Sequence, residues 1–197
     1  MTGTIIACLL SYWVGSIPNG LIVGKAVWGI DLREHGSHNI GATNAWRTIG
    51  KAAGFTIFLL DLLKGVLGVW FGMHFGGTPL ALVLGGIFAI VGHSCSFLLK
   101  FKGGKGVATG LGVIAMLMPM PTIIVFAVWF IIVKITGYVS LGSIVAAALV
   151  PVLAWYCNLP KETIAFGVLA AAFIIIRHHE NIGRLLNGTE SKIKAAK

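Results

Sequence analysis

The chain has 197 residues, of which 57% are hydrophobic and only 11% are charged, and its mean hydropathy is +0.92. This composition excludes a soluble enzyme, a disordered tail and a simple nucleic-acid-binding protein. The formal net charge of +9 and the 27 glycines are both well above what is usual for a chain of this length. We therefore expect an integral membrane protein with no nucleic-acid partner.

Long uncharged apolar stretches predict membrane-spanning helices, because about 20 apolar residues cross a hydrocarbon core of about 30 Å. The expected fold class is all-α, a polytopic helix bundle of about seven transmembrane helices in a single domain, residues 1–197. Five or six crossings remain the alternative, because the fourth segment is short and Pro119 and Pro121 leave room only for a tight turn before the fifth. The predicted segments are 2–24, 54–75, 79–99, 107–119, 121–136, 140–157 and 162–177.

The positive charges predict the orientation in the membrane. With seven crossings, every Lys and Arg except Lys161 and the intrahelical Lys64 falls on one side. The positive-inside rule then places the N-terminus outside and the C-terminus in the cytoplasm. We expect the first segment to be a retained helix, since no cation precedes Lys25 and the segment is longer than the apolar core of a signal peptide.

Three polar segments lie on this basic side. The first, residues 31–47, combines glycines with the hydrogen-bond donors Ser37, Thr43 and Asn44. Such a segment can wrap an anion in a nest of backbone N–H groups. The alternative is a solvated connecting loop made of turn-forming residues.

The second segment, residues 101–109, has three glycines that let the backbone approach a phosphate and a point charge at Lys105. The N-terminus of the following helix would add partial positive charge. It is not a nucleotide P-loop, because Gly106 and Leu99 stand where that motif needs Ser or Thr and Gly. A membrane anchor with a flexible turn is the alternative.

The third segment, residues 177–184, places His178 and Asn181 three positions apart, so both could face one ligand from one side of a helix. Gly183 replaces the second His of an H-E-x-x-H zinc motif. An interfacial basic patch for anionic lipid is the alternative. Taken together, the three segments predict a phosphorylated ligand.

Within the second predicted helix, Asp61 and Lys64 are three apart and can form an ion pair, since unpaired charge in a membrane costs several kcal/mol. We interpret this pair as structural, and His93 as either a helix-end hydrogen bonder or a pocket residue. The cysteines, Cys8, Cys95 and Cys157, share no motif, and we expect no disulfide framework, metal or cofactor.

Seven short motifs run in order from residue 15 to residue 184: Gly15-Ser-Ile-Pro18, Gly36-Ser-His-Asn-Ile-Gly-Ala-Thr-Asn44 with Arg47, Asp61-Leu-Leu-Lys-Gly65, Gly92-His93, Phe101-Lys-Gly-Gly-Lys-Gly-Val-Ala-Thr109, Gly137-Tyr-Val-Ser-Leu-Gly-Ser143 and His178-His-Glu-Asn-Ile182. Together they resemble the motifs of the bacterial membrane acyl-phosphate:glycerol-3-phosphate acyltransferases, the PlsY type. At His38, Ile40 and Ser96 many members of that family have Gly, Pro and Pro instead.

The resemblance implies transfer of a fatty acyl group from acyl phosphate to the sn-1 hydroxyl of glycerol 3-phosphate, giving lysophosphatidic acid and phosphate. It also implies a multi-pass protein of the bacterial plasma membrane, with its active site facing the cytoplasm and with the chain able to act as a monomer.

By motif position, the resemblance assigns Ser37, Gly41, Thr43 and Asn44 to the acyl-phosphate head group, helped by the backbone near Gly103 and Gly104. Arg47, Lys105, Ser143, His178 and Asn181 would hold glycerol 3-phosphate. His178 is the candidate general base, unless the substrate's own phosphate takes the proton. On these grounds the predicted catalytic residues are His178, Lys105 and Ser37.

An organic-phosphate transporter and a lipid-binding scaffold are the competing functions. Transport requires access from both membrane faces, whereas the predicted outer connections carry one cation and few polar ligands. Product formation from the two substrates would distinguish an enzyme from both alternatives.

Overall fold

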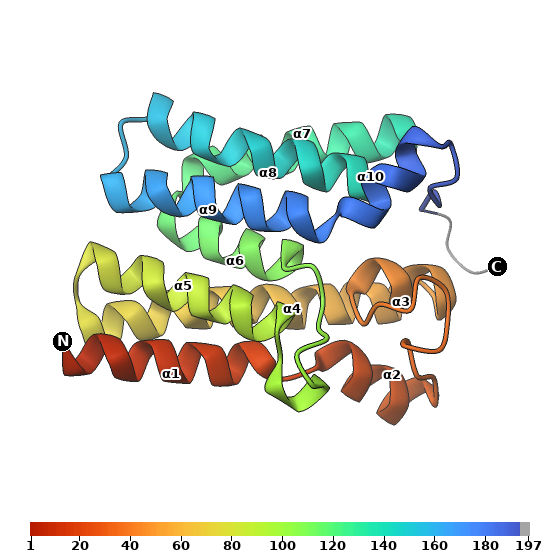
Figure 1. Ribbon diagram of the computed structural model, residues 1–197, viewed down its shortest axis with the longest axis horizontal. Helices are drawn as coiled ribbons and strands as arrows, with labels where there is room; N and C mark the ends of the chain where they lie inside the picture. Colours follow the sequence, from red (N-terminus) through yellow and green to blue (C-terminus); the bar gives the residue numbers. More distant parts are fainter. Residues whose placement is uncertain (194–197) are drawn as a thin grey trace. The chain divides into compact units, whose positions relative to one another are not determined.

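The computed structural model describes residues 1–193, which form helices and no strands and fall into two compact units (Figure 1). Unit 1 comprises Met1–Val113 and unit 2 comprises Ile114–Ile193. The all-helical fold class is thus confirmed over the described residues. Lys194 and Lys197, which entered the prediction of orientation, lie outside them.

Three long helices build unit 1: α1 (Thr2–Ser16), α4 (Lys51–Phe71) and α5 (Pro79–Ser94), each packed against the other two (Figure 1). Small residues allow this close packing, as in other membrane helices. A Cβ added to Gly65 would lie 2.0 Å from the carbonyl oxygen of Thr109, so the start of α6 (Val107–Leu117) lies directly against α4.

Shorter helices surround this core. The π-helical turn η1 (Gly72–Gly76) extends α4, α3 (Ala42–Thr48) packs on α4, and the 3-10 turn η2 (Phe97–Leu99) follows α5. The first predicted segment, 2–24, is helical and falls within one candidate span, but the helix is interrupted: α1 ends at Ser16 and α2 (Asn19–Trp28) begins after Pro18. Proline lacks a backbone N–H and clashes with the preceding turn, which explains the break.

Unit 2 is built around α8 (Val139–Tyr156), which packs on both α7 (Pro119–Thr136) and α9 (Lys161–Arg177). The predicted tight turn between the fourth and fifth segments is confirmed, because Met118 alone separates α6 from α7. The short α10 (His179–Leu186) follows α9 at a bend of 59°. The chain then returns to α8, where the Ile193 backbone N–H donates to the Gly137 carbonyl oxygen (2.7 Å).

Five helical segments are long and apolar enough to cross a membrane, and the bent pair α9–α10 would make a sixth. The first of them, Thr2–Trp28, joins α1 and α2 across the break at Pro18. At 1.5 Å per residue the eleven residues of α6 span only about 16 Å, short of the hydrocarbon core. All seven predicted apolar segments are therefore helical, but length and composition support five or six crossings.

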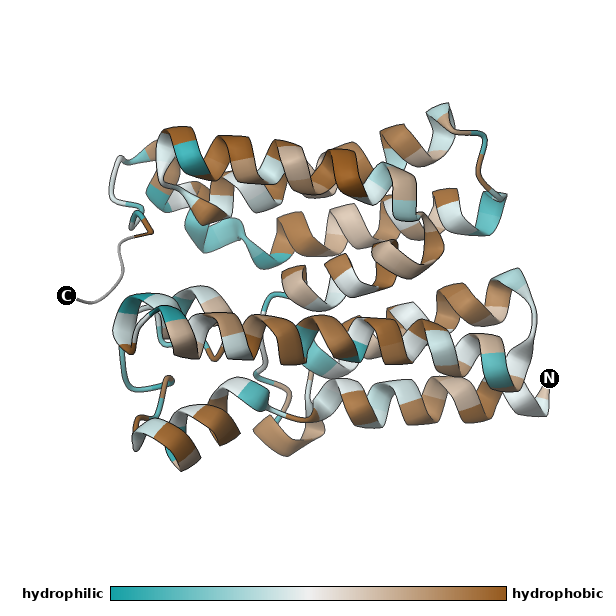
Figure 2. Ribbon diagram, turned by 180° about the vertical axis from the view of Figure 1, so that it is seen from behind, coloured by the Kyte–Doolittle hydropathy of each residue, from teal (hydrophilic) through white to brown (hydrophobic). Residues whose placement is uncertain are grey.

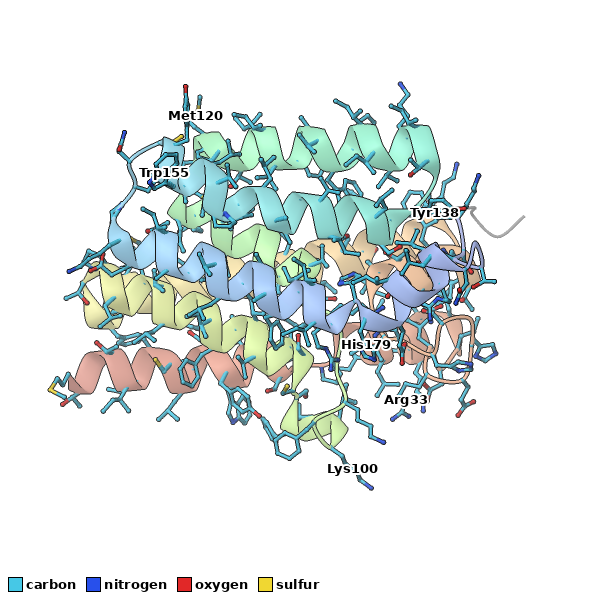
Figure 3. All side chains as sticks on the ribbon, turned by 45° about the horizontal axis from the view of Figure 1, so that its top comes forward. Arg33, Lys100, Met120, Tyr138, Trp155 and His179 are labelled. Carbon is cyan, nitrogen blue, oxygen red and sulfur yellow. The ribbon has the colours of Figure 1, made fainter. Side chains whose placement is uncertain are left out.

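Hydrophilic residues are concentrated in the connections and at the helix ends, while the helices themselves are mostly hydrophobic (Figure 2). In unit 1 the polar segments 29–41 and 95–106 approach each other, because Arg33 of the first and Lys100 and Lys102 of the second line one cavity. In unit 2, Tyr138 lies at the end that carries α10, and Met120 and Trp155 lie at the opposite end (Figure 3). Each unit thus has one polar end that carries its candidate functional residues.

Candidate functional site

The first polar segment of unit 1 is folded around the side chain of Asn44, which is buried at the start of α3. Its amide nitrogen donates to the carbonyl oxygens of Leu32 (3.0 Å), His35 (2.9 Å) and Asn39 (2.8 Å). Its Oδ1 accepts the backbone N–H of Ser37 (2.9 Å). The side-chain amide therefore holds the loop in shape, a role that the sequence did not reveal.

The exposed Ser37 follows Gly36, whose φ of +61° is in the left-handed region that favours glycine. A Cβ at Gly36 would also lie 2.2 Å from Asn44 Oδ1. His38 has a φ of +55°, also in the left-handed region that side chains other than glycine rarely adopt. The loop therefore presents Ser37 through a backbone path that few residues can adopt.

Asp31 fixes the beginning of this loop. Its carboxylate accepts two hydrogen bonds from the Arg33 guanidinium (3.0 and 2.6 Å) and forms an ion pair with Lys25 (2.9 Å). The Arg33 hydrogen bond, opposed by burial and reinforced by Lys25, holds the pKa of Asp31 well below its usual range. The predicted ligands Gly41, Thr43 and Arg47 follow on and beside α3, all of them half-buried.

The second polar segment turns tightly against the end of α5. The backbone N–H of Gly103 donates to the Ser94 carbonyl oxygen (3.0 Å), and that of Gly104 donates to the His93 carbonyl oxygen (3.1 Å). These two N–H groups are thus bonded within the protein, and the glycines let the segment approach the end of α5 closely. The half-buried Lys105 follows them, two residues before α6 begins.

The two basic segments of unit 1 meet at a cavity of about 300 Å³. Arg33 lines it from the first segment, and Leu98, Leu99, Lys100 and Lys102 line it from the second. Figure 3 shows Lys100 projecting outward from this end of the unit. The segments that carry Ser37 and Lys105 therefore approach each other.

The predicted ion pair inside α4 is confirmed, since Lys64 Nζ lies 3.0 Å from Asp61 Oδ1 and both side chains are buried. Asn19 donates to the same carboxylate oxygen (3.1 Å), and Lys64 donates to the Ile17 carbonyl oxygen at the break between α1 and α2. His93 Nδ1 lies 3.6 Å from Asp61 Oδ1. The pair thus forms part of a buried polar cluster that reaches α5.

In unit 2, α9 ends where α10 begins, at the buried His178, so no single helix runs through His178 and Asn181 as we had expected. His178 Nδ1 lies 2.7 Å from the Ile174 carbonyl oxygen. A carbonyl oxygen only accepts, so Nδ1 carries a proton, and in the neutral ring the lone pair is on Nε2. This arrangement suits a base that acts through Nε2.

A residue that the sequence analysis missed, Glu190, organises this end of unit 2. Its buried carboxylate accepts hydrogen bonds from Ser140 (2.7 Å), Asn181 (2.6 Å) and Arg184 Nε (2.7 Å). Burial alone would raise the pKa of Glu190, but these three donors outweigh it and lower the pKa. The signal in the sequence was slight, because Glu190 looks like an ordinary charge after the last helix.

The predicted ligand Ser143 lies one turn beyond Ser140 on α8 and is buried. Its hydroxyl donates to the Val139 carbonyl oxygen (2.9 Å) and accepts from Trp129 Nε1 (3.3 Å). Glu190 joins Ser140 on α8 to Asn181 on α10, so unit 2 brings Ser143, His178 and Asn181 to one end. Unit 1 likewise carries Ser37, Gly41, Thr43, Asn44, Arg47, Gly103, Gly104 and Lys105 at one end.

Comparison with known proteins gives a consistent result along the whole chain. A family model described as glycerol-3-phosphate acyltransferase matches residues 5–188. Proteins named glycerol-3-phosphate acyltransferase from Fusobacterium nucleatum and Bacillus subtilis are 42% and 44% identical; each alignment covers 94% of this chain, and 96% and 95% of the relative.

Two solved structures are similar in fold. Crystal structures of PlsY (YgiH), an integral membrane glycerol 3-phosphate acyltransferase, match this chain in the glycerol 3-phosphate form and in the lysophosphatidic acid form. The first has a TM-score of 0.91 at 37% identity and covers 97% of this chain and 96% of the PlsY chain. The second has a TM-score of 0.86 at 35% identity, with coverages of 96% and 94%.

Proposed function

Because this chain belongs to the glycerol-3-phosphate acyltransferase family and is therefore a membrane acyltransferase, we propose that its acyl donor is an acyl phosphate. The fatty acyl group passes to the sn-1 hydroxyl of glycerol 3-phosphate, and the products are lysophosphatidic acid and inorganic phosphate. This reaction is the first acylation of phospholipid synthesis. The observation that carries the proposal is that two basic segments of unit 1 line one cavity, in a chain whose helices are mostly apolar.

Acyl phosphate is a mixed anhydride with a good leaving group, so the protein needs no covalent intermediate. Its main task is to hold two mutually repelling anions with the acceptor hydroxyl close to the acyl carbonyl carbon. It must also stabilise the charge that develops on the carbonyl oxygen and the departing phosphate. The cationic segments supply the positive charge that these tasks require.

In unit 1, we assign Ser37, Gly41 and Thr43 to the head group of the acyl phosphate. Asn44 keeps this loop in shape through its four hydrogen bonds to backbone groups of the loop. The backbone near Gly103 and Gly104 helps to hold this head group. Lys105 and Arg47 hold the phosphate of glycerol 3-phosphate, where the lysine acts as a compact positive charge.

In unit 2, we assign Ser143, His178 and Asn181 to glycerol 3-phosphate. His178 takes the proton from the sn-1 hydroxyl at Nε2, because the hydrogen bond from Nδ1 to the Ile174 carbonyl oxygen fixes the ring in that tautomer. Histidine is the side chain that most often serves as a general base. Transfer of that proton to the substrate's own phosphate is the alternative that the His178→Gln variant tests.

We propose further that the chain is a single acyltransferase domain of the bacterial plasma membrane, with its N-terminus outside and its polar ends facing the cytoplasm. The distribution of Lys and Arg supports this orientation. Cys157 is exposed just after α8, on the expected outer side, and provides a natural reporter. A membrane-impermeant thiol reagent should label it in intact cells, and a Cys157→Ser variant is the control. Labelling of Cys157 only after the membrane is opened would indicate the opposite orientation.

The reaction is tested with purified protein supplied with a long-chain acyl phosphate and labelled glycerol 3-phosphate. The expected result is labelled lysophosphatidic acid, with no product when an acyl thioester replaces the acyl phosphate. Product only from the thioester would refute the proposed donor. Uptake of glycerol 3-phosphate into sealed vesicles without chemical change would support an organic-phosphate transporter instead.

A further inference from the structure

His93 connects two features of unit 1 that the proposed reaction treats separately. One edge of its imidazole, at Nδ1, lies 3.6 Å from Asp61 Oδ1 in the buried ion pair of α4. The opposite edge, at Nε2, faces Gly104, where an added Cβ would lie 2.1 Å from Nε2. The ring therefore fills the space between a buried carboxylate and the loop that carries Lys105.

The Asp61–Lys64 pair has partners of its own without His93. Asp61 Oδ1 receives Lys64 Nζ and Asn19 Nδ2, and Lys64 also donates to the Ile17 carbonyl oxygen. These contacts neutralise the buried charges and satisfy the backbone where the first span breaks at Pro18. Packing of α1, α2 and α4 thus accounts for the pair, and the placement of His93 needs another explanation.

The loop depends on His93 through both backbone and side chain. The His93 carbonyl oxygen accepts the Gly104 N–H (3.1 Å), so the two residues are held in close contact. The His93 ring is buried and rests against Gly104, and Asp61 Oδ1 lies 3.6 Å from its Nδ1 on the other side. A buried ring packed between Asp61 and Gly104 sets the path of residues 103–105 and with it the position of Lys105.

We propose that His93 is a positioning residue for phosphate binding: packed between Asp61 and Gly104, its ring fixes the Gly103–Gly104 loop and thereby places the ammonium group of Lys105. The inference rests on the proposed role of Lys105. A histidine that only fills space would affect folding stability, whereas a positioning residue also changes phosphate binding and does so through Lys105.

A double-mutant cycle tests this coupling. Asparagine at position 93 keeps a polar group near Asp61 but removes the ring that rests against Gly104. We expect His93→Asn to lower kcat/KM by at least about tenfold, since misplacing a binding group by about 1 Å can cost up to about a hundredfold. In a Lys105→Ala background the same change should cost less than about threefold, because the group that it misplaces is already absent.

Two further variants complete the cycle. His93→Gln has a longer side chain that reaches toward Gly104, and its activity should recover to within about threefold of the wild type. This variant tests the proposal if the asparagine variant folds poorly. His74→Asn changes an exposed histidine at the far end of α4, in η1, and should leave the kinetics unchanged. The proposal would be overturned if His93→Asn lowered kcat/KM by the same factor in the wild type and in the Lys105→Ala protein. Wild-type kinetics in the single His93→Asn variant would overturn it as well.

A readout without turnover separates this inference from the proposed reaction. Inorganic phosphate should raise the melting temperature of the wild-type protein, and His93→Asn should raise the half-saturating phosphate concentration about tenfold, as Lys105→Ala does. An unchanged phosphate response in His93→Asn overturns the inference, whatever the activity. Conversely, normal phosphate binding by the wild type without lysophosphatidic acid would reject the reaction and leave the inference standing.

Discussion

Replacing Gly103 with alanine changes the loop that carries Lys105 without touching any charged group. The new Cβ would lie 2.1 Å from the carbonyl oxygen of His93 and 3.0 Å from its carbonyl carbon. These are backbone atoms at the end of α5, so they cannot move aside as a flexible side chain could. The loop itself must therefore shift.

The size of the shift follows from these distances. An ordinary contact between the new Cβ and the His93 carbonyl oxygen requires about 3.4 Å, whereas the present loop position would give 2.1 Å. The loop must therefore move by more than about 1 Å. That movement weakens the hydrogen bonds from Gly103 to Ser94 and from Gly104 to His93, each worth about 1 kcal/mol. It also displaces Lys105, and a displacement of about 1 Å costs up to about a hundredfold in rate.

Steady-state kinetics with both substrates varied will measure the effect. We expect Gly103→Ala to lower kcat/KM between about tenfold and a hundredfold, with the helices still formed by circular dichroism. The matched control is Gly183→Ala on α10, where no atom lies within 4 Å of the added Cβ, and which should retain normal kinetics. Wild-type kcat/KM in a folded Gly103→Ala protein would refute the proposed role of the loop.

Four further changes test the remaining assignments. Lys105→Ala should lower kcat/KM more than about tenfold, and an unchanged rate would remove Lys105 from the site. His178→Gln should reduce kcat by about a hundredfold, whereas near-normal turnover would assign the proton to substrate phosphate. Asn44→Asp replaces donors that face three carbonyl oxygens with an acceptor, so activity should fall and proteolysis within residues 31–41 should accelerate; wild-type resistance would contradict this. Glu190→Gln should cost about 2 kcal/mol of stability. Because folding lowers the pKa of Glu190, the carboxylate contributes fully to the free energy of unfolding at pH values above the ordinary pKa of 4.5. This contribution is lost as the pH falls below 4.5 toward the lowered pKa. The melting temperature of the variant should therefore decline less on acidification than that of the wild type. Parallel plots of melting temperature against pH for the two proteins would contradict a stabilising role of the Glu190 carboxylate.

The helices could be predicted because burial in a membrane leaves a direct mark on composition. The apolar runs predicted every long helix, and Pro119 predicted the tight turn after α6. The separation of α2 from α1 and the short helix α3 were not predicted, since both depend on tertiary partners. The break at Pro18 is stabilised by Lys64 and Asn19, residues that only the folded chain brings together.

For the candidate site, the sequence indicated the residue types better than their roles. Spacing alone predicted the Asp61–Lys64 pair, because i and i+3 positions meet on any helix. It did not predict that Asn44 binds its own loop or that Glu190 collects three donors, since both depend on contacts between separate elements. The bend at His178 was likewise hidden, because residues 177–184 contain no proline.

The most direct test counts both products in a single reaction. Purified protein given acyl phosphate and glycerol 3-phosphate should release one inorganic phosphate for each lysophosphatidic acid formed, and Lys105→Ala and His178→Gln should slow both in proportion. Phosphate release that does not depend on glycerol 3-phosphate, or that continues at the wild-type rate in these variants while lysophosphatidic acid is lost, would contradict the account.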